Sequence, residues 1–313
     1  MKTLAISGAN SFVGQHLIRL LLQDASLKLR LLCHSAGYSS EIGFSHVQYL
    51  KGDLLSPESL SCFVDKADVV ITLAYLWGVT IEDNVSAVKN LFDVSVKNGV
   101  KRFIHCSTAV VVGRTKEIVV CESSSCFPRS EYEKSKYEIE KMLLSHSSDM
   151  CEVIILRPTA VFGFNGKNVL KIVNDIRYGN RLINYIKYYM YGYRKLNLVP
   201  VENVIGSIVF LFKCKHNIAN EVFIVSGDDS VNNNYRYVAD AVMKSIGISI
   251  PLFLKEELPP AILKFLLFCY GRSVVDPMIT YSSEKLFNLG YVQAVSFEIA
   301  LEEYIDCQLS GSM

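Results

Sequence analysis

The 313-residue sequence lacks an excess of charge of either sign. Its 32 lysine and arginine residues nearly balance 31 aspartate and glutamate residues, for a net charge of +1. No basic tail or block of like charges is present. Nucleic-acid binding is therefore not expected, because such binding depends on clustered basic residues.

Long apolar runs and metal-type cysteine spacings are also lacking. No apolar run reaches the roughly 20 residues needed to span a bilayer, and the opening MKTLAISGANS turns polar too early for a secretory signal. The nine cysteines show no metal-ligand spacing, so we expect reduced thiols packed as small apolar side chains, and no metal site. A cytoplasmic protein is expected. The apolar segment 259–271 either packs as a helix or lies peripherally at a membrane interface.

Strand-like runs alternate with amphipathic helical segments in the first third of the chain. Strands are expected at 3–8, 27–33, 46–53, 68–74 and 101–108, and helices at 12–23, 57–67 and 83–99, the last closed by Gly99. This alternation predicts an α/β fold, a Rossmann-like doubly wound parallel sheet with helices on both faces. Ligands of such sheets bind outside the carboxyl ends of the strands.

The loop after the first strand, SGANSFVG, has the pattern of a dinucleotide-binding turn. Gly8 permits a tight turn, Gly14 allows close helix packing, and N–H groups at the helix start would face a pyrophosphate. Ser11 occupies the position where a glycine usually allows closest approach, which weakens the motif; a plain strand–helix turn is the alternative. The candidate cofactor contacts here are Gly8, Asn10, Ser11, Phe12, Val13 and Gly14.

The next loops supply further candidate cofactor contacts. No carboxylate follows the second strand, where an acidic residue would bind the ribose hydroxyl of NAD; His34 stands there, so NADP is slightly favoured and NAD stays open. Asp53 could accept from an adenine amine or cap the helix near Ser56. The remaining candidates in these loops are Leu54, Leu73 and Ala74.

Residues 130–142, SEYEKSKYEIEKM, place Tyr132 and Lys136 one helical turn apart, on one face of a helix. The stretch is either a charged surface helix or the acid/base pair of an oxidoreductase. A free tyrosine titrates at about 10, too high for a good base at neutral pH. A nearby ammonium group would stabilise the phenolate.

Several motifs occur in one order along the chain: SGANSFVG, GDL, VVITLA, FIHCSTAVVVG, YEKSK, LRPTAVFG, LVPVENVIGSIVFLF and ITYSSEKLFNLGY. In them the chain resembles the extended short-chain dehydrogenases/reductases, specifically the NAD-dependent epimerase/dehydratase group that acts on nucleotide sugars. The resemblance implies a homodimeric, NAD- or NADP-dependent enzyme, as in polysaccharide biosynthesis. Its Rossmann-like domain would take residues 1–163 plus about 198–226, and a smaller, interleaved substrate lobe would take 164–197 and 227–313.

The resemblance also implies roles for individual residues. Tyr132 would be the general acid/base, Lys136 would bind the nicotinamide ribose and lower the tyrosine pKa, and Thr108 would hydrogen-bond the reacting oxygen. Pro158 would shape the nicotinamide pocket. Ser107 and Thr108 are candidate substrate contacts. So are Lys187 and Arg194, in a tyrosine-rich segment that could meet a diphosphate or form a surface hairpin.

The two residues after Thr108 narrow the chemistry. Sugar dehydratases of the group carry an Asp-Glu pair there, whereas this chain has Ala109 and Val110, which cannot transfer protons. A dehydratase is therefore disfavoured, and an epimerase and a ketoreductase both remain. The resemblance of the back half to polysaccharide-type epimerases leads us to expect a nucleotide-sugar epimerase. The alternatives are an NADPH-dependent ketoreductase of a 4-keto sugar and a sterol-type dehydrogenase of apolar alcohols. A non-catalytic cofactor sensor is disfavoured, because Thr108, Tyr132 and Lys136 are all present.

Overall fold

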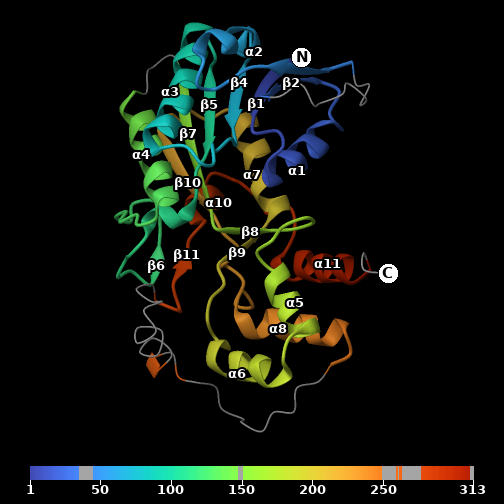
Figure 1. Cartoon of the computed structure of the whole chain (residues 1–313). Coiled ribbons are helices and arrows are strands. Elements are labelled where there is room, and N and C mark those ends of the chain that lie inside the picture. The colour runs from blue at the N-terminus through green and yellow to red at the C-terminus, as the bar shows by residue number, and fades with distance from the viewer. Residues whose placement is uncertain (35–44, 147–150, 249–258, 260, 263–275, 311–313) are drawn as a thin grey trace. The chain divides into compact units, whose positions relative to one another are not determined.

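The computed structural model describes residues 1–34, 45–146, 151–248, 259, 261–262 and 276–310. Its main feature is a seven-stranded sheet with the order β10-β7-β5-β4-β1-β2-β3 (Figure 1). The strands are β1 (Lys2–Ser7), β2 (Leu27–Cys33), β3 (Val47–Lys51), β4 (Val69–Thr72), β5 (Arg102–Cys106), β7 (Glu152–Pro158) and β10 (Glu221–Val225). All pairs from β7 to β3 are parallel, which confirms the predicted sheet and fold class.

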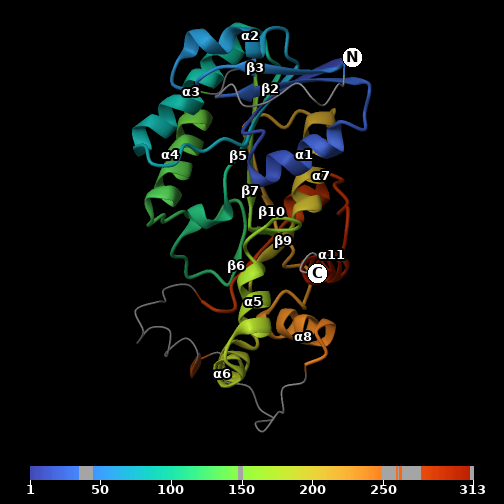
Figure 2. The ribbon, with the colours of Figure 1, turned by 45° about the vertical axis from the view of Figure 1, so that its right-hand side comes forward.

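Helices flank both faces of this sheet. The described α-helices are α1 (Phe12–Leu21), α2 (Ser61–Val64), α3 (Ile81–Lys97), α4 (Glu131–Ser145), α5 (Leu170–Tyr178), α6 (Arg181–Tyr191), α7 (Val201–Lys213), α8 (Tyr235–Ser245), α10 (Glu284–Asn288) and α11 (Phe297–Ser310). Figures 1 and 2 show α3 and α4 on one face and α1 on the other. The helix expected at 57–67 is shorter, with a 3₁₀ turn at Pro57–Leu60 leading into α2.

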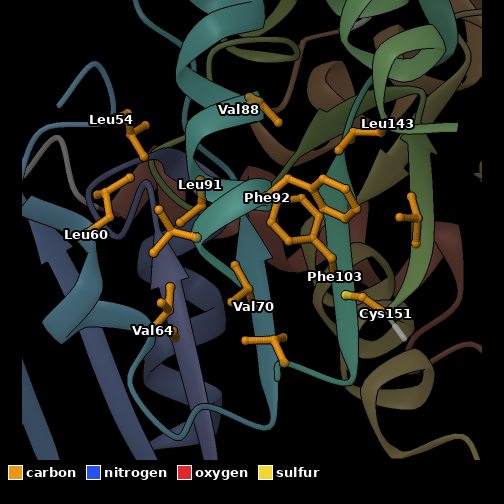
Figure 3. Packing of buried hydrophobic residues seen from close by; sticks show 14 of the residues in the cluster. Leu54, Leu60, Val64, Val70, Val88, Leu91, Phe92, Phe103, Leu143 and Cys151 are labelled. Atoms are coloured by element: carbon orange, nitrogen blue, oxygen red, sulfur yellow. The ribbon is translucent and has the colours of Figure 1, made fainter. Parts of the chain in front are cut away.

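A large apolar core lies between the sheet and helices α3 and α4 (Figure 3). Phe92 of α3 meets Phe103 of β5 edge to face, with ring centroids 5.3 Å apart. Leu143 of α4 is fully buried in the same cluster. Gly99 follows α3 with φ of 72°, the left-handed conformation of a helix-ending glycine, as expected. This packing fixes α4, the helix that carries Tyr132, against the sheet.

The described chain divides into two compact units. The first comprises 1–111, 128–157 and 207–223, and the second 112–127, 158–206 and 224–313. Residues 112–127, 158–163, 198–206 and 224–226 belong to the second unit, whereas the prediction placed them in the Rossmann-like domain. Two of these segments carry β8 (Ala160–Phe162) and β9 (Leu198–Pro200), which pair with each other inside the second unit.

The second unit has its own small sheets and core. Besides β8 with β9, β6 (Val119–Val120) pairs with β11 (Thr280–Tyr281). Its core gathers α5, α8 and α11 around Phe162, whose ring meets those of Phe297 and Tyr304. Segment 259–271, for which a helix or an interfacial position was expected, lies mostly outside the described residues. No helix in the described part of the chain is long and apolar enough to cross a membrane.

Candidate active site

The turn between β1 and α1 is built as a close-packed cradle. Gly8 has φ of 77°, and a Cβ on it would lie 2.5 Å from the backbone nitrogen of Ala74, beyond β4. A Cβ on Gly14 would lie 2.3 Å from the carbonyl oxygen of Gly8. Only glycine fits either position without moving backbone. The turn therefore brings Leu73 and Ala74 beside Gly8, as a dinucleotide cradle requires.

Ser11 caps α1 instead of providing extra space. Its Oγ accepts a hydrogen bond of 3.1 Å from the Gly14 N–H, which stabilises the helix start. The first N–H groups of α1 have no partner within the helix and form an anion site together with the helix dipole. Asn10 is exposed, and its carbonyl accepts from Gln15 at 3.0 Å. The residues present thus fit the pyrophosphate of a dinucleotide, although Ser11 replaces the usual glycine.

The candidate adenosine contacts His34 and Asp53 lie close to each other. His34 Nε2 is 3.8 Å from the Asp53 carboxylate, and both side chains are largely exposed. Asp53 Oδ1 accepts from the Leu55 N–H at 2.9 Å, so it shapes its own turn; no side-chain cap bond is made at Ser56. Leu54 is buried in the core beneath α3 and α4, and its carbonyl accepts a hydrogen bond from Asn90. His34 and Asp53 are thus available to a ribose or an adenine, and Leu54 supports them.

The three candidate catalytic residues come together on β5 and α4. Thr108 lies just beyond the end of β5 and hydrogen-bonds Tyr132, in the first turn of α4. Lys136, one turn later, is only 3% exposed, and its Nζ donates to the Cys106 carbonyl at 3.0 Å. Ser107 is buried, and its N–H donates to the Leu156 carbonyl, so it extends the pairing of β5 with β7.

The electrostatics of this cluster differ from the expectation. Burial raises the pKa of Tyr132 to about 12; Cys106 and Tyr75 add to the rise, and the bond from Thr108 opposes it. Lys136 is not among the causes of this shift, and its ammonium group donates to the Cys106 carbonyl. Burial lowers the pKa of Lys136 itself, against the attraction of Cys106 and Glu140. In this geometry Tyr132 is a neutral phenol at neutral pH, suited to donate a proton.

Helix α4 is positioned by a cap and a buried ion pair. Ser130 Oγ accepts from the Glu133 N–H, and the Glu133 carboxylate accepts from the Ser130 N–H, a complete capping box. One turn beyond Lys136, Glu140 binds Arg157 of β7 through contacts of 2.6 and 3.1 Å. Both side chains of the pair are almost fully buried. Helix α4 is therefore fixed to the sheet on the face that carries Lys136.

Two aromatic residues that the sequence reasoning missed complete this cluster. Tyr75 lies edge to face with Tyr132, with ring centroids 4.9 Å apart, and the Lys136 Nζ lies 5.4 Å from the Tyr75 ring. The Trp77 ring is parallel to that of Tyr132, with centroids 5.8 Å apart and an interplanar angle of 8°. The sequence LAYLWG, residues 73–78, could have indicated them, because it places two aromatic residues directly after a strand whose carboxyl end was expected to face the ligand.

The other candidate residues lie in the second unit. Pro158 ends β7. Lys187 Nζ binds the Asp175 carboxylate at 2.8 Å, linking α6 to α5. The Arg194 guanidinium lies 5.7 Å from the Tyr191 ring. Lys187 and Arg194 thus have partners within this unit, and their role in substrate binding stays a prediction.

The fold and the glycine turn after β1 are those of a dinucleotide-dependent enzyme, and the acid/base role of Tyr132 and Lys136 stays a prediction. The chain belongs to the NAD dependent epimerase/dehydratase family, whose model matches residues 4–225. This membership confirms the predicted resemblance. It makes the protein an NAD-dependent epimerase or oxidoreductase and bears out the expected nicotinamide cofactor.

Three relatives with assigned activities are similar in sequence. UDP-glucose 4-epimerase of Vibrio cholerae is 26% identical over 74% of this chain and 72% of its own length. Sterol-4-alpha-carboxylate 3-dehydrogenase of Candida albicans is 25% identical over 52% of this chain and 51% of its own. dTDP-4-dehydrorhamnose reductase of Aggregatibacter actinomycetemcomitans is 28% identical over 55% of each.

Solved structures share the fold over nearly the whole chain. UDP-glucuronic acid 4-epimerase from Bacillus cereus, in complex with NAD, has a TM-score of 0.73 at 21% identity, covering 98% of this chain and 96% of its own. dTDP-glucose 4,6-dehydratase from Bacillus anthracis, also with NAD, has a TM-score of 0.74 at 17% identity, covering 99% and 97%. At these identities the likeness concerns the fold.

Proposed function

We propose that this protein is an NAD-dependent nucleotide-sugar epimerase. It would oxidise a sugar hydroxyl to a ketone and return the hydride to the other face of the same carbon. The observation that carries the proposal is the Thr108–Tyr132–Lys136 cluster together with the lack of a carboxylate at the two positions that follow Thr108. Ala109 is buried and Val110 is apolar, so neither can move the protons that water elimination requires. The match to UDP-glucose 4-epimerase over most of the chain supports the same substrate class.

The residues of this chain would divide the work between proton transfer and positioning. Thr108 hydrogen-bonds the Tyr132 hydroxyl and so helps to fix the position of the tyrosine oxygen. Lys136 is held by the Cys106 carbonyl and adds a positive charge at the back of the site. Bound NAD supplies the hydride acceptor. In reduction of the ketone the neutral Tyr132 phenol would donate its proton to the substrate oxygen, and in oxidation of the hydroxyl the Tyr132 phenolate would take that proton. Both roles need the tyrosine oxygen within about 2.6–3.2 Å of the substrate oxygen.

A second candidate is a ketoreductase that consumes the reduced cofactor. Two observations favour it: no carboxylate follows β2, where His34 stands, and a dTDP-4-dehydrorhamnose reductase is among the relatives. The similarity to a sterol dehydrogenase supports apolar alcohols as a third candidate class of substrate for this protein. All three reactions use the same tyrosine, so the substrate pocket decides between them.

The deciding experiment is turnover of a substrate panel. Purified protein is incubated with UDP- and dTDP-sugars, their 4-keto-6-deoxy forms and sterol alcohols, while nicotinamide absorbance and product stereochemistry are followed. An epimerase interconverts sugars with no net change in absorbance, whereas a reductase consumes the reduced cofactor stoichiometrically with a keto sugar. Turnover of sterols alone would overturn the proposed substrate class.

Tyr132→Phe serves as the internal control for this assay. It should lower turnover by several orders of magnitude with cofactor affinity nearly unchanged, because it removes the proton donor and little else. Turnover close to wild type in Tyr132→Phe would contradict the assignment of the acid/base.

A further inference from the structure

An exposed tryptophan stands beside the catalytic tyrosine. Trp77 is the single tryptophan of the chain, and 78% of its surface is exposed. It lies in the loop between β4 and α3, where Tyr75 meets it edge to face at 4.8 Å. Tyr75 also meets Tyr132 in the same way, so the three rings form one aromatic cluster with Tyr132 at its inner end.

The backbone that carries Trp77 is held in place. Asn84 of α3 is 3% exposed, and its side-chain amide binds both polar groups of Leu76: Oδ1 accepts from the N–H at 2.9 Å, and Nδ2 donates to the carbonyl at 3.0 Å. At the other end of the loop, Thr80 and Asp83 form a complete capping box at the start of α3. The exposed indole is therefore mounted on an ordered loop.

This exposure has no explanation in the packing of the first unit. A buried tryptophan contributes a large apolar area to a core, but most of the Trp77 surface faces solvent. Tryptophan offers a wide, rigid apolar face with little side-chain entropy to lose, which makes it effective in ligand contacts. A hydroxyl that exchanges a proton with Tyr132 must come within about 3 Å of its oxygen. The ring bearing that hydroxyl then comes within reach of the indole.

We propose that Trp77 is a specificity-determining residue whose indole packs against the apolar C–H face of the sugar ring. This inference rests on the proposed function and adds to it which part of the substrate Trp77 recognises. The proposal assigns Trp77 a contact with the sugar alone and none with the nucleoside diphosphate. Tyr75 acts as a positioning residue, since it touches both the indole and the catalytic ring.

The test compares binding of a nucleotide sugar with binding of the nucleotide alone. Calorimetry with UDP-glucose, UDP-glucuronic acid and free UDP is carried out in the Tyr132→Phe background, which prevents turnover. Trp77→Ala should raise the Kd for the nucleotide sugars by roughly 10- to 100-fold and leave the Kd for UDP and NAD unchanged. Trp77→Tyr should recover most of the affinity. Tyr178→Ala, which removes another exposed aromatic in the second unit, should change none of these values.

Trp77 also reports on its own surroundings in the wild-type protein. Because it is the single tryptophan, its fluorescence should change on addition of UDP-glucose and stay constant on addition of UDP. Wild-type turnover of nucleotide sugars with an unchanged sugar-to-UDP affinity ratio in Trp77→Ala would overturn this inference and leave the proposed function standing. Weakened binding of NAD in place of sugar would overturn it too. Failure of the wild type to bind or convert any nucleotide sugar would overturn both.

Discussion

The buried ion pair between Glu140 and Arg157 makes a sharp prediction about stability. Glu140 is 1% exposed and Arg157 is 4% exposed, so neither charge is hydrated. Glu140→Gln keeps the shape of the side chain and removes its charge. The arginine is then buried without its carboxylate, which typically lowers the free energy of unfolding by about 3–5 kcal/mol. Native proteins are stable by only about 5–15 kcal/mol, so the loss should be easily measured.

The same helix offers a matched control. Glu138 pairs with Lys141 at 2.6 Å, but both of these side chains are about half exposed. Exposed pairs contribute about 0–1 kcal/mol, so Glu138→Gln should be nearly silent. Urea unfolding followed by circular dichroism should show a clear fall in midpoint for Glu140→Gln alone. Equal midpoints for the two variants would refute the reasoning. The double variant Glu140→Leu with Arg157→Met should recover most of the loss, because apolar side chains of similar volume replace the whole pair.

Three further predictions concern the turn, the buried tyrosines and a buried hydroxyl. Gly8→Ala should destabilise the protein and weaken NAD binding, whereas Gly78→Ala, with φ of 78° but nothing within 4 Å, should show only the backbone strain of roughly 1 kcal/mol; equal losses of stability would contradict the clash. Burial raises the pKa of Tyr132 and Tyr235 to about 12 from an ordinary 10.0, so the unfolded state loses these protons first. The free energy of unfolding should therefore fall as pH rises from about 10 to about 12, and a flat or rising urea midpoint over that range would be inconsistent with it. Thr72→Val should leave stability unchanged or raise it by roughly 1 kcal/mol in thermal unfolding, because the Thr72 hydroxyl is fully buried with no hydrogen-bond partner among the described residues; a marked loss would indicate an unseen partner.

The parallel sheet and the Tyr132–Lys136 helix were predictable because their signals are local. Strands of unbroken apolar residues, a glycine pair at the first turn and a one-turn spacing can all be read from a short stretch. The contacts of Tyr132 and Lys136, however, are made with residues far away in the sequence. Lys136 donates to the carbonyl of Cys106, thirty positions earlier in the chain, and Tyr132 stacks on Trp77 of the loop between β4 and α3. No spacing rule encodes such contacts, so the raised pKa of Tyr132 and the aromatic cluster required the structure.

The loop that carries Trp77 is held at both ends by hydrogen bonds to the start of α3. The amide of Asn84 holds its beginning, and the capping box of Thr80 and Asp83 holds its end. The residues between these anchors belong neither to the sheet nor to α4, and Trp77 alone among them has a ring contact with Tyr132 of α4 in the described part of the chain. Under the proposed function, substrate preference would therefore diverge by exchange of a few residues of this loop, while Tyr132 and Lys136 are kept on α4. For the engineer the same arrangement marks residues 77–79 as the place to begin a directed-evolution library.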